Sequence, residues 1–406
     1  MLITTGQPSV NPRIVKEADA LHAAGYKVVM LYCYWIKWAY ESDKKLLKNV
    51  SWSYNFIGGA PAENKVLYFF TKAKFKIYNI LSSKGYYKNL IAERSQARCY
   101  DELLHAAKAI KADIYIAHNL GALSVAVKAA GKNKAASGFD FEDYHREENE
   151  GEKDTIKKKV VFLEEKYVPY LSYLSTSSPQ ITERVRANFS SFNKPVFTLL
   201  NCFPLAQQPQ KRADNNEQTL QLFWFSQTIG KNRGLEAVVL ALKELNNPDI
   251  QLTLAGNPDT EMTAFIEESA GNIKDCIHFA GIIQPGELPA FAARFDVGLA
   301  TEIATPLNRN ICLTNKIFTY LLAGNCILAS DTKAQKDFVN SYKGIGMLYK
   351  NDDARDLAEK IRILYNDKAL LKQCKENAYC LASEKLNWEH ESKKLFRVIS
   401  LTAYRS

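Results

Sequence analysis

Short apolar runs alternate with amphipathic helical segments along most of this 406-residue chain, and this alternation constrains the fold more than any other feature. Residues 2–5 predict a short strand and residues 27–34 a buried strand. Between them, residues 13–24 have apolar side chains three and four positions apart, as in a helix. Strands that alternate with helices pair in parallel through right-handed crossovers. The sequence therefore predicts an α/β fold with doubly wound sheets.

The alternation runs in two series, and a chain of this length is too long for one compact core. Between the series, residues 203–218 are rich in proline, glutamine and asparagine and poor in helix signals. We therefore expect an N-terminal domain over residues 1–202, a linker over 203–218 and a C-terminal domain over 219–385. Residues 386–406 are expected to form a final helix that crosses back to the N-terminal domain. Further strands are expected at residues 113–117, 135–136, 173–176, 195–200, 220–225, 251–255, 277–279, 297–300 and 326–329, and a long helix near 156–172.

The eight cysteines are scattered through apolar or helical stretches, and none forms a C-x-x-C pair or a cluster with histidine at metal-ligand spacing. Free thiols and no metal site are therefore expected. The chain shows no charged-then-apolar leader and no apolar run of bilayer-spanning length. These features predict a cytoplasmic protein that is neither secreted nor membrane-spanning.

The net charge of +9 is concentrated in the segment Lys65–Arg98, which has eight basic residues and one acidic residue. At helical pitch, one arc of this segment is apolar and is expected to be its core face. That arc contains Val66, Phe69, Phe70, Ala73, Ile77, Ile80 and Leu81. A second arc carries Lys65, Lys72 and Lys76, which suits an anionic membrane surface or a lipid-pyrophosphate acceptor. A solvated basic helix without a partner is the alternative, and no nucleic acid is expected because no recognised binding motif accompanies the charge.

Two segments in the second series predict an anion site. Thr314 is a good N-cap, and Lys316 then lies in the first turn of the following helix, where the positive end of the helix dipole repels it. A lysine there makes sense if an anion binds at that helix end, although a solvated lysine is the simpler alternative. The loop Ser226–Gly234 follows a predicted strand and carries Lys231 and Arg233, as expected of a phosphate-binding loop at the edge of a sheet.

Taken together, these motifs resemble those of the GT-B retaining glycosyltransferases of the group-1, or family-four, type, especially bacterial enzymes of capsule, O-antigen or exopolysaccharide synthesis. The resemblance covers nearly the whole chain and rests on the loop Gly6–Arg13, the helix Thr314–Gly324, and the segments Leu254–Pro258 and Phe279–Ile283. It implies two Rossmann-like domains that face a central cleft. It also implies transfer of a sugar, with retention and without metal, from a nucleotide-sugar donor to a glycan or lipid-linked acceptor. The nucleotide-sugar would be a substrate, so no cofactor is expected.

The resemblance assigns donor binding to the second domain, with the diphosphate at the basic loop and the helix start, and the nucleobase near Ile282 and Ile283. The implied donor-binding residues are Gln227, Lys231, Arg233, Asn257, Ile282, Ile283, Glu302, Asn310, Thr314, Asn315, Lys316 and Thr319. Many members carry two glutamates spaced E-x7-E, and these positions fall here on Ile311 and Thr319. The Thr319 hydroxyl is expected to replace one carboxylate at the ribose, with Glu302 and Asn310 as further polar groups.

In the first domain, the acidic stretch Phe139–Arg146 stands where relatives carry Asp-x-His-Glu or a similar motif, facing the acceptor and the donor sugar. We therefore predict catalytic roles for Glu142, Asp143 and His145. The alternative is a solvated acidic loop neutralised by Arg146. Predicted acceptor-side residues are Gly6, Asn11, Arg13 and His118.

The missing glutamates leave two other functions open. One is a non-catalytic GT-B-like subunit that binds or regulates within a glycan assembly complex, and the other is a sugar-nucleotide epimerase.

Overall fold

The computed structural model describes residues 1–88, 90–148, 154–211 and 218–403, and its internal contacts divide the chain into two units. The first unit is Met1–Leu199 together with the chain from Ser392 onward, and the second is Leu200–Glu391. The last helix, α17 (Trp388–Ala403), therefore has residues assigned to both units. Of the expected linker, residues 212–217 lie outside the described residues.

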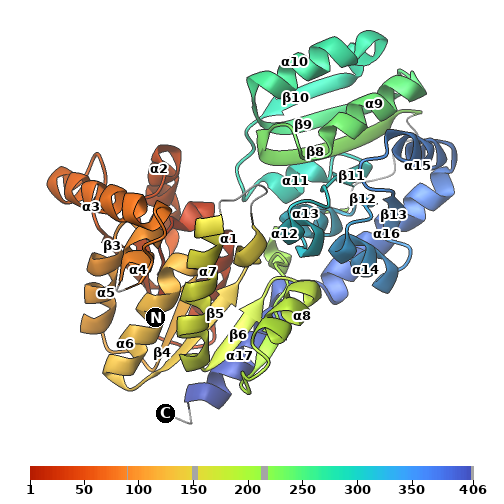
Figure 1. The fold of residues 1–406 in the computed structure, drawn as a ribbon. Coiled ribbons are helices and arrows are strands. Elements are labelled where there is room, and N and C mark those ends of the chain that lie inside the picture. The colour runs from red at the N-terminus through yellow and green to blue at the C-terminus, as the bar shows by residue number, and fades with distance from the viewer. Residues whose placement is uncertain (89, 149–153, 212–217, 404–406) are drawn as a thin grey trace. The chain divides into compact units, whose positions relative to one another are not determined.

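The first unit is built on a seven-stranded parallel sheet with the order β3-β2-β1-β4-β5-β6-β7 (Figure 1). Strands β1 and β5 are buried along their whole length, which explains why the sheet appears in the sequence as apolar runs. The strands are β1 (Leu2–Thr4), β2 (Val29–Cys33), β3 (Ser53–Ile57), β4 (Ile114–His118), β5 (Ala136–Phe141), β6 (Tyr173–Thr176) and β7 (Val196–Thr198).

The helices of the first unit connect these strands. Asn11 caps α1 by accepting a hydrogen bond from the Ile14 amide at 3.3 Å, and Pro12 occupies the first helical position, as the sequence predicts. The helices are α1 (Pro12–Ala23), α2 (Lys37–Leu46), α3 (Lys65–Ser83), α4 (Ile91–Gln96), α5 (Tyr100–Ala109), α6 (Leu120–Asn133), α7 (Asp154–Tyr167) and α8 (Pro179–Asn188). Strand β3 and helices α2 and α4 were not predicted, and the helix expected over 156–172 ends in a short 3-10 turn, Val168–Tyr170.

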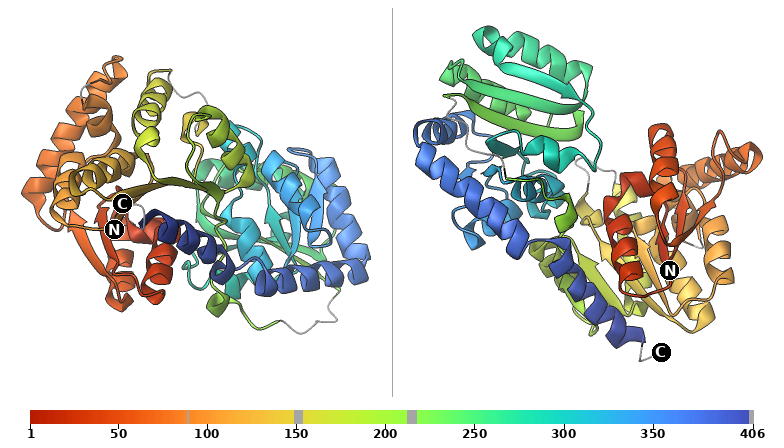
Figure 2. Two further views of the ribbon diagram at one scale, coloured as in Figure 1. Left: turned by 90° about the horizontal axis from the view of Figure 1, so that it is seen from below. Right: turned by 180° about the vertical axis from the view of Figure 1, so that it is seen from behind.

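The second unit contains a six-stranded parallel sheet with the order β10-β9-β8-β11-β12-β13. Alternate residues of β8 enter two separate hydrophobic clusters, Leu222 and Trp224 in one and Phe223 in the other. Both faces of this sheet are therefore covered by helices (Figure 2). The strands are β8 (Leu220–Ile229), β9 (Ile250–Pro258), β10 (Ile277–Gly281), β11 (Val297–Ala300), β12 (Cys326–Ser330) and β13 (Gly346–Tyr349). The helices are α9 (Leu235–Leu245), α10 (Thr260–Ser269), α11 (Leu288–Ala292), α12 (Leu307–Ile311), α13 (Asn315–Ala323), α14 (Lys333–Ser341), α15 (Ala354–Asn366) and α16 (Lys368–Glu384).

Two predicted loops begin as strand. The acidic stretch Phe139–Arg146 starts inside β5, because the charge of Asp140 is paired within the protein and does not end the strand. Likewise, the basic loop predicted from Ser226 begins only after Ile229, since β8 continues past the apolar run and pairs with β9 up to Pro258.

The apolar arc of α3 corrects a further prediction. This arc was expected to be the core face, but all its large side chains except Leu81 are exposed to solvent, and the buried residues of the helix are Thr71 and Ser82. Helical periodicity identifies the apolar face, and tertiary packing here places that face outward.

The tight approach of α13 to β11 gives a stability test. A Cβ at Gly298 would lie 2.2 Å from the ring of Tyr320, which is fully buried and donates hydrogen bonds to two strand carbonyls at 3.2 Å. We expect Gly298→Ala to lower the unfolding free energy by about 1–3 kcal/mol, because a rigid backbone and a buried ring must separate. Thermal and urea unfolding measure this change.

Gly131→Ala in α6 is the matched control. Nothing lies within 4 Å of a Cβ there, so the substitution should leave stability unchanged or raise it by up to about 1 kcal/mol. Equal destabilisation by the two variants would contradict the packing argument.

Candidate functional site

A buried ion pair lies at the carboxyl edge of the first sheet. Arg13, in the first turn of α1, donates from Nε to Asp140 Oδ2 at 2.6 Å and from Nη2 to Asp140 Oδ1 at 2.8 Å. Ser175 of β6 donates to the same carboxylate at 2.6 Å, and both charged side chains are excluded from solvent. Burial alone would raise the pKa of Asp140, but Arg13 keeps it below its ordinary value. The pair therefore ties the start of α1 to the end of β5 as two fixed charges.

His118 extends this network from the last position of β4. Its Nε2 lies 3.1 Å from Glu17 Oε2, and its Nδ1 lies 3.7 Å from Asp140 Oδ2. Burial opposes protonation of the ring, but Glu17 and Asp140 raise the pKa of His118 above its usual value. One ligand-type atom from each of Glu17, His118 and Asp140 falls within 4.8 Å of the others, the spacing of a metal site. Both Asp140 oxygens, however, already accept from Arg13, whose positive charge would repel a divalent cation.

The predicted acceptor-side residues occupy two different environments. Arg13 and His118 are at most 1% exposed, so they can act on an acceptor only through the residues that they contact. Gly6 and Asn11 are half-buried. The Gly6 carbonyl accepts from the Cys33 amide, and Asn11 is the α1 cap.

The residues after β5 are more accessible. Glu142 and Asp143 are half-buried, and burial raises the pKa of Glu142 to about 7 despite the nearby Arg13 cation. His145 is buried, and Glu148, 3.0 Å from Nδ1, raises its pKa although burial opposes this. A carboxyl group that gains and loses its proton near neutral pH is suited to general acid–base work.

The alternative of a solvated acidic loop requires Arg146 to neutralise the acidic stretch, but Arg146 pairs with another part of the chain. Its Nε donates to Glu164 of α7 at 2.5 Å, and burial outweighs this contact so that the pKa of Glu164 is raised. The guanidinium is thus engaged by α7 and by the ring of Phe189, 5.1 Å away.

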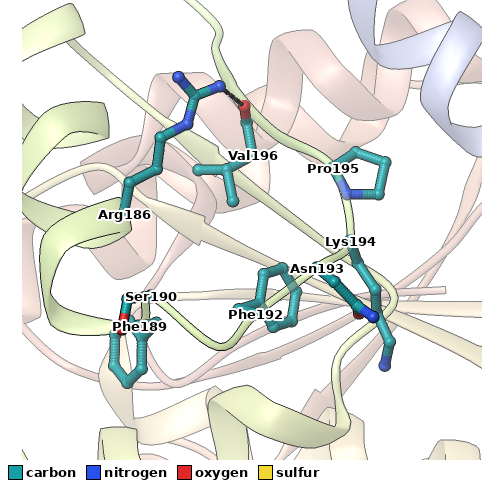
Figure 3. Close-up of a pocket in the computed structure, with 8 residues that line it drawn as sticks. All are labelled: Arg186, Phe189, Ser190, Phe192, Asn193, Lys194, Pro195 and Val196. Carbon is teal, nitrogen blue, oxygen red and sulfur yellow. Dashed lines mark hydrogen bonds between the residues drawn. The ribbon is translucent and has the colours of Figure 1, made fainter.

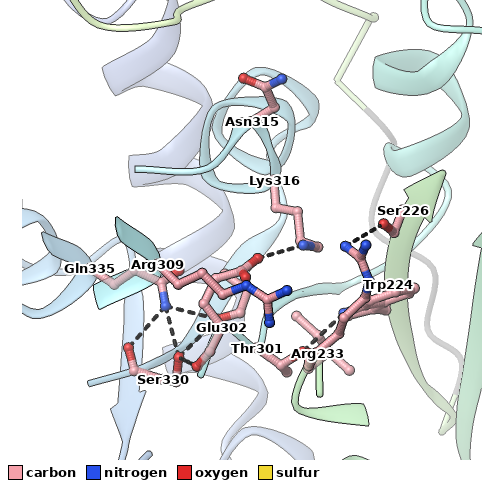
Figure 4. A network of polar contacts seen from close by, with 12 residues as sticks. Trp224, Ser226, Arg233, Thr301, Glu302, Arg309, Asn315, Lys316, Ser330 and Gln335 are labelled. Carbon is pink, nitrogen blue, oxygen red and sulfur yellow. Dashed lines mark hydrogen bonds and ion pairs between the residues drawn. The ribbon is translucent and has the colours of Figure 1, made fainter. Parts of the chain in front are cut away.

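The second unit gathers three cations around one buried carboxylate (Figure 4). Lys316 Nζ donates to Glu302 Oε1 at 2.5 Å, and both side chains are about 9% exposed. Burial would raise the pKa of Glu302, but Lys316, Arg309 and Arg233 together lower it, so the group stays ionised. Three cations against one anion leave a local excess of two positive charges.

The strand ends and loops hold these cations in place. Arg233 donates to Ser226 Oγ at 3.1 Å, while its carbonyl accepts from Thr301 Oγ1 at 2.8 Å. Trp224 donates to the same Thr301 hydroxyl at 2.9 Å, and the Lys316 ammonium lies 5.3 Å from the Trp224 ring centroid. The next residue, Gly234, adopts φ +75°, and a Cβ there would lie 2.6 Å from the Thr301 carbonyl oxygen. Only glycine therefore permits this close approach of the basic loop to the end of β11.

The start of α13 is open to a ligand. Thr314 is the N-cap, but its side chain caps no amide, and its buried Oγ1 has no hydrogen-bond partner among the described residues. Asn315 is exposed and accepts from Asn201 at 2.6 Å. Free amides, an unpartnered hydroxyl and an excess of positive charge form a suitable seat for an anion.

The structure corrects the donor contact predicted for Thr319 and shows a structural contact of Asn310. Thr319 is fully buried and its hydroxyl donates to the Asn315 carbonyl within α13 at 3.0 Å, so it cannot reach a ribose. Asn310 accepts from the Lys333 amide at 2.8 Å and thereby serves the start of α14. Ile311, at the other E-x7-E position, is buried.

The remaining predicted donor residues lie on loops and strand ends of the second unit. Gln227, Lys231, Asn257 and Ile282 are exposed, and Ile283 is half-buried against the second hydrophobic cluster. Lys231 lies 4.0 Å from Glu261, a weak surface contact. None of these four exposed residues is held by the Glu302 network in the described contacts.

Sequence reasoning missed Arg309, Trp224 and Thr301. Arg309 lies in the short helix α12 and donates to the Asn232 carbonyl, which brings it beside the basic loop. A five-residue helix gives no periodic signal, so only its position shortly before the Thr314 cap hinted at a role. Trp224 appears in the sequence as an ordinary strand residue, and Thr301 as the residue that follows a predicted strand.

Both cavities described here lie away from these charges. A cavity of about 680 Å³ is lined by Arg186, Phe189, Phe192 and Lys194 before the amino end of β7 (Figure 3). Because the first sheet is parallel, that edge is opposite to the one carrying His118 and Asp140. A second cavity of about 440 Å³ adjoins β10, near Ile277 and Phe279.

Comparison with known proteins finds a family model that matches part of the chain. Residues 207–380 match the family model described as Glycosyl transferases group 1. No curated protein sequence matches the chain.

Solved structures are similar along the whole length. HepE from Anabaena, in complex with UDP, aligns over 98% of this chain and 99% of its own with a TM-score of 0.68 and 14% identity. Sucrose-phosphate synthase from Thermosynechococcus elongatus aligns over 100% of both chains with a TM-score of 0.71 and 14% identity. A glycosyltransferase from Rickettsia africae aligns over 100% and 98% with a TM-score of 0.67 and 12% identity. The two Rossmann-like units and these neighbours show that the chain has the GT-B fold.

The buried pair in the first unit predicts a large loss of stability on substitution. Asp140→Asn removes the carboxylate paired with the buried Arg13 guanidinium and should cost about 3–5 kcal/mol of unfolding free energy. Glu359→Gln, which breaks the exposed pair with Arg362, should cost less than about 1 kcal/mol. Denaturant unfolding checks both values, and similar costs would contradict the role of burial.

Glu142 predicts a pH dependence. With a pKa of about 7 in the folded chain against an ordinary value of 4.5, Glu142 keeps a proton that the unfolded chain has lost between these values. Stability from this group is therefore fully present below pH 4.5 and falls as the pH rises to about 7. Thermal unfolding at pH 5 and pH 8 should show Glu142→Gln gaining stability relative to the unsubstituted protein at pH 8. An equal difference at both pH values would contradict the raised pKa.

Proposed function

We propose that this protein transfers a sugar from a nucleotide-sugar donor to a glycan or lipid-linked acceptor. The main support is the convergence of Arg233, Arg309 and Lys316 on Glu302 beside the open start of α13. The match of residues 207–380 to group 1 glycosyl transferases and the UDP bound by HepE favour a nucleoside diphosphate as the anion.

In the proposed reaction the bond between the anomeric carbon and the diphosphate oxygen breaks as the acceptor oxygen attacks the same carbon. Negative charge then develops on the departing diphosphate, where the two guanidinium groups and the α13 amides stabilise it. The acceptor's proton passes to the departing phosphate, which is consistent with retention of the anomeric configuration. We assign the protein to cell-surface polysaccharide synthesis by its resemblance to bacterial enzymes of that class.

The acceptor side is assigned to the carboxyl edge of the first sheet. Glu142 and Asp143 are the accessible carboxyl groups there, and the Arg13–Asp140–His118 network beneath fixes the end of β5 that carries them. A polar, partly ionised edge of this kind suits the hydroxyl groups of a sugar.

A non-catalytic binding subunit is the second candidate. It is favoured by the absence of carboxylates at Ile311 and Thr319, both of which are buried. Such a subunit would bind the nucleotide without turning over any donor, whereas the proposed enzyme does both.

Arg309→Ala tests the donor site, because the guanidinium is partly exposed and its loss leaves the Lys316–Glu302 pair intact. Loss of one charge-assisted contact should weaken UDP binding about tenfold to a hundredfold, as measured by isothermal titration calorimetry. Release of UDP from a panel of UDP-sugars should fall in parallel.

Lys350→Ala is the matched control, since it removes the same charge at an exposed position. Unchanged UDP affinity in Arg309→Ala would refute the donor site. UDP binding in the unsubstituted protein, with no turnover of any nucleotide-sugar by potential acceptors, would favour the binding subunit.

A further inference from the structure

Helix α3 is attached to the first unit through its polar, tyrosine-bearing side. Arg98 donates to Thr71 Oγ1 at 2.5 Å and stacks 4.9 Å from the Tyr68 ring centroid. Arg94 donates to the Tyr78 hydroxyl at 2.8 Å. These arginine contacts occupy the face of α3 that packs inward, so the apolar arc is left facing solvent.

That exposed arc is large. Val66 is 84% exposed and Phe70 61%, and the arc also contains Phe69, Ile77 and Ile80, each about half exposed or more. Apolar side chains exposed together on one helix face mark a binding surface more often than an accident of folding.

A second exposed apolar group lies at the start of α2. Trp35 is 67% exposed and Trp38 48%. Tyr34 packs against both Tyr40 of α2 and Tyr68 of α3, with ring centroids 5.9 and 5.6 Å apart, so Tyr34 bridges the starts of the two helices. Of the 17 large apolar side chains exposed in the described part of the chain, ten lie between residues 35 and 86.

The same segment holds nearly all of the excess charge. Residues 35–98 contain twelve lysines and arginines against four acidic residues, a net charge of +8 out of +9 for the whole chain. Lys65, Lys72 and Lys76 are exposed along one border of the apolar arc. On the other border, Lys74 is neutralised by Asp101 and Glu102.

We propose that the outer face of α3 and the start of α2 dock on the surface of an anionic lipid bilayer. The apolar side chains would enter the boundary between headgroups and acyl chains, the lysines would contact lipid phosphates, and the two tryptophans would lie at the interface. A second copy of the chain fits this face poorly, because a two-fold interface would bring two strongly positive surfaces together. In the described part of the chain no helix is long and apolar enough to cross a membrane, so the contact would be with one leaflet.

Vesicle sedimentation tests this proposal, which does not depend on the transfer reaction. The protein should sediment with vesicles of equal parts phosphatidylcholine and phosphatidylglycerol, and far less with phosphatidylcholine alone or at high salt. Phe69→Ser/Phe70→Ser should reduce binding at least about tenfold by removing buried apolar area. Lys72→Glu/Lys76→Glu should reduce it about a hundredfold or more.

Leu240→Ser/Leu401→Ser is the matched control, because both leucines are exposed outside this surface. It should bind vesicles as the unsubstituted protein does. Circular dichroism and UDP affinity should be unchanged in all three variants, since every substituted side chain is exposed. Failure to sediment with anionic vesicles, or full binding by the α3 variants, would overturn the proposal. So would a dimer, seen by light scattering, that the α3 substitutions abolish, since that result assigns the face to a second copy.

Discussion

A buried ion pair joins the start of a helix to the end of a strand in each sheet, and the organisation of both candidate sites depends on these two pairs. Arg13 and Asp140 connect α1 to β5, and Lys316 and Glu302 connect α13 to the residues after β11. A parallel sheet brings the carboxyl ends of all its strands to one edge, where ligands bind. The loops at this edge need polar contacts that hold them in place and still leave the edge open to a ligand. A fixed pair of charges supplies such an anchor, because breaking it would leave an uncompensated charge in the interior.

The two pairs differ in the net charge that remains around them. In the first unit, Arg13 and His118 are balanced by Asp140 and Glu17, and this network is closed to solvent. In the second unit, Glu302 balances only one of the three surrounding cations, and two arginines keep partial access to solvent. The first network is therefore suited to holding a strand end in place, and the second is suited to attracting a doubly charged anion. Glu302 also reduces the repulsion among the cations before any ligand arrives, which preorganises the site.

The sequence predicted the architecture better than the sites, for physical reasons. Parallel strands such as β6 and β11 are buried throughout, and their predicted bounds match the observed ones. Site residues depend on contacts between distant segments, which periodicity does not encode. Thr319 has the right position to replace a ribose-binding glutamate, but its hydroxyl bonds to the helix backbone four residues earlier. Arg309 gave no signal, since its contact with the Asn232 carbonyl requires α12 to fold back on the basic loop.

Helix α3 shows most clearly what could not be predicted from the sequence, namely which face of an amphipathic helix is buried. Its periodicity correctly separates an apolar arc from a basic one. An amphipathic pattern alone, however, does not determine which face packs against the rest of the protein. The deciding contacts come from Arg94 and Arg98, which reach Tyr78 and Thr71 on the tyrosine-bearing side. An arginine can stack on a tyrosine ring and donate hydrogen bonds at once, so this face gains stabilising contacts without a hydrophobic core. The apolar arc is then not covered by other described parts of the chain. Because lysines border this arc, an anionic lipid surface is its complementary environment.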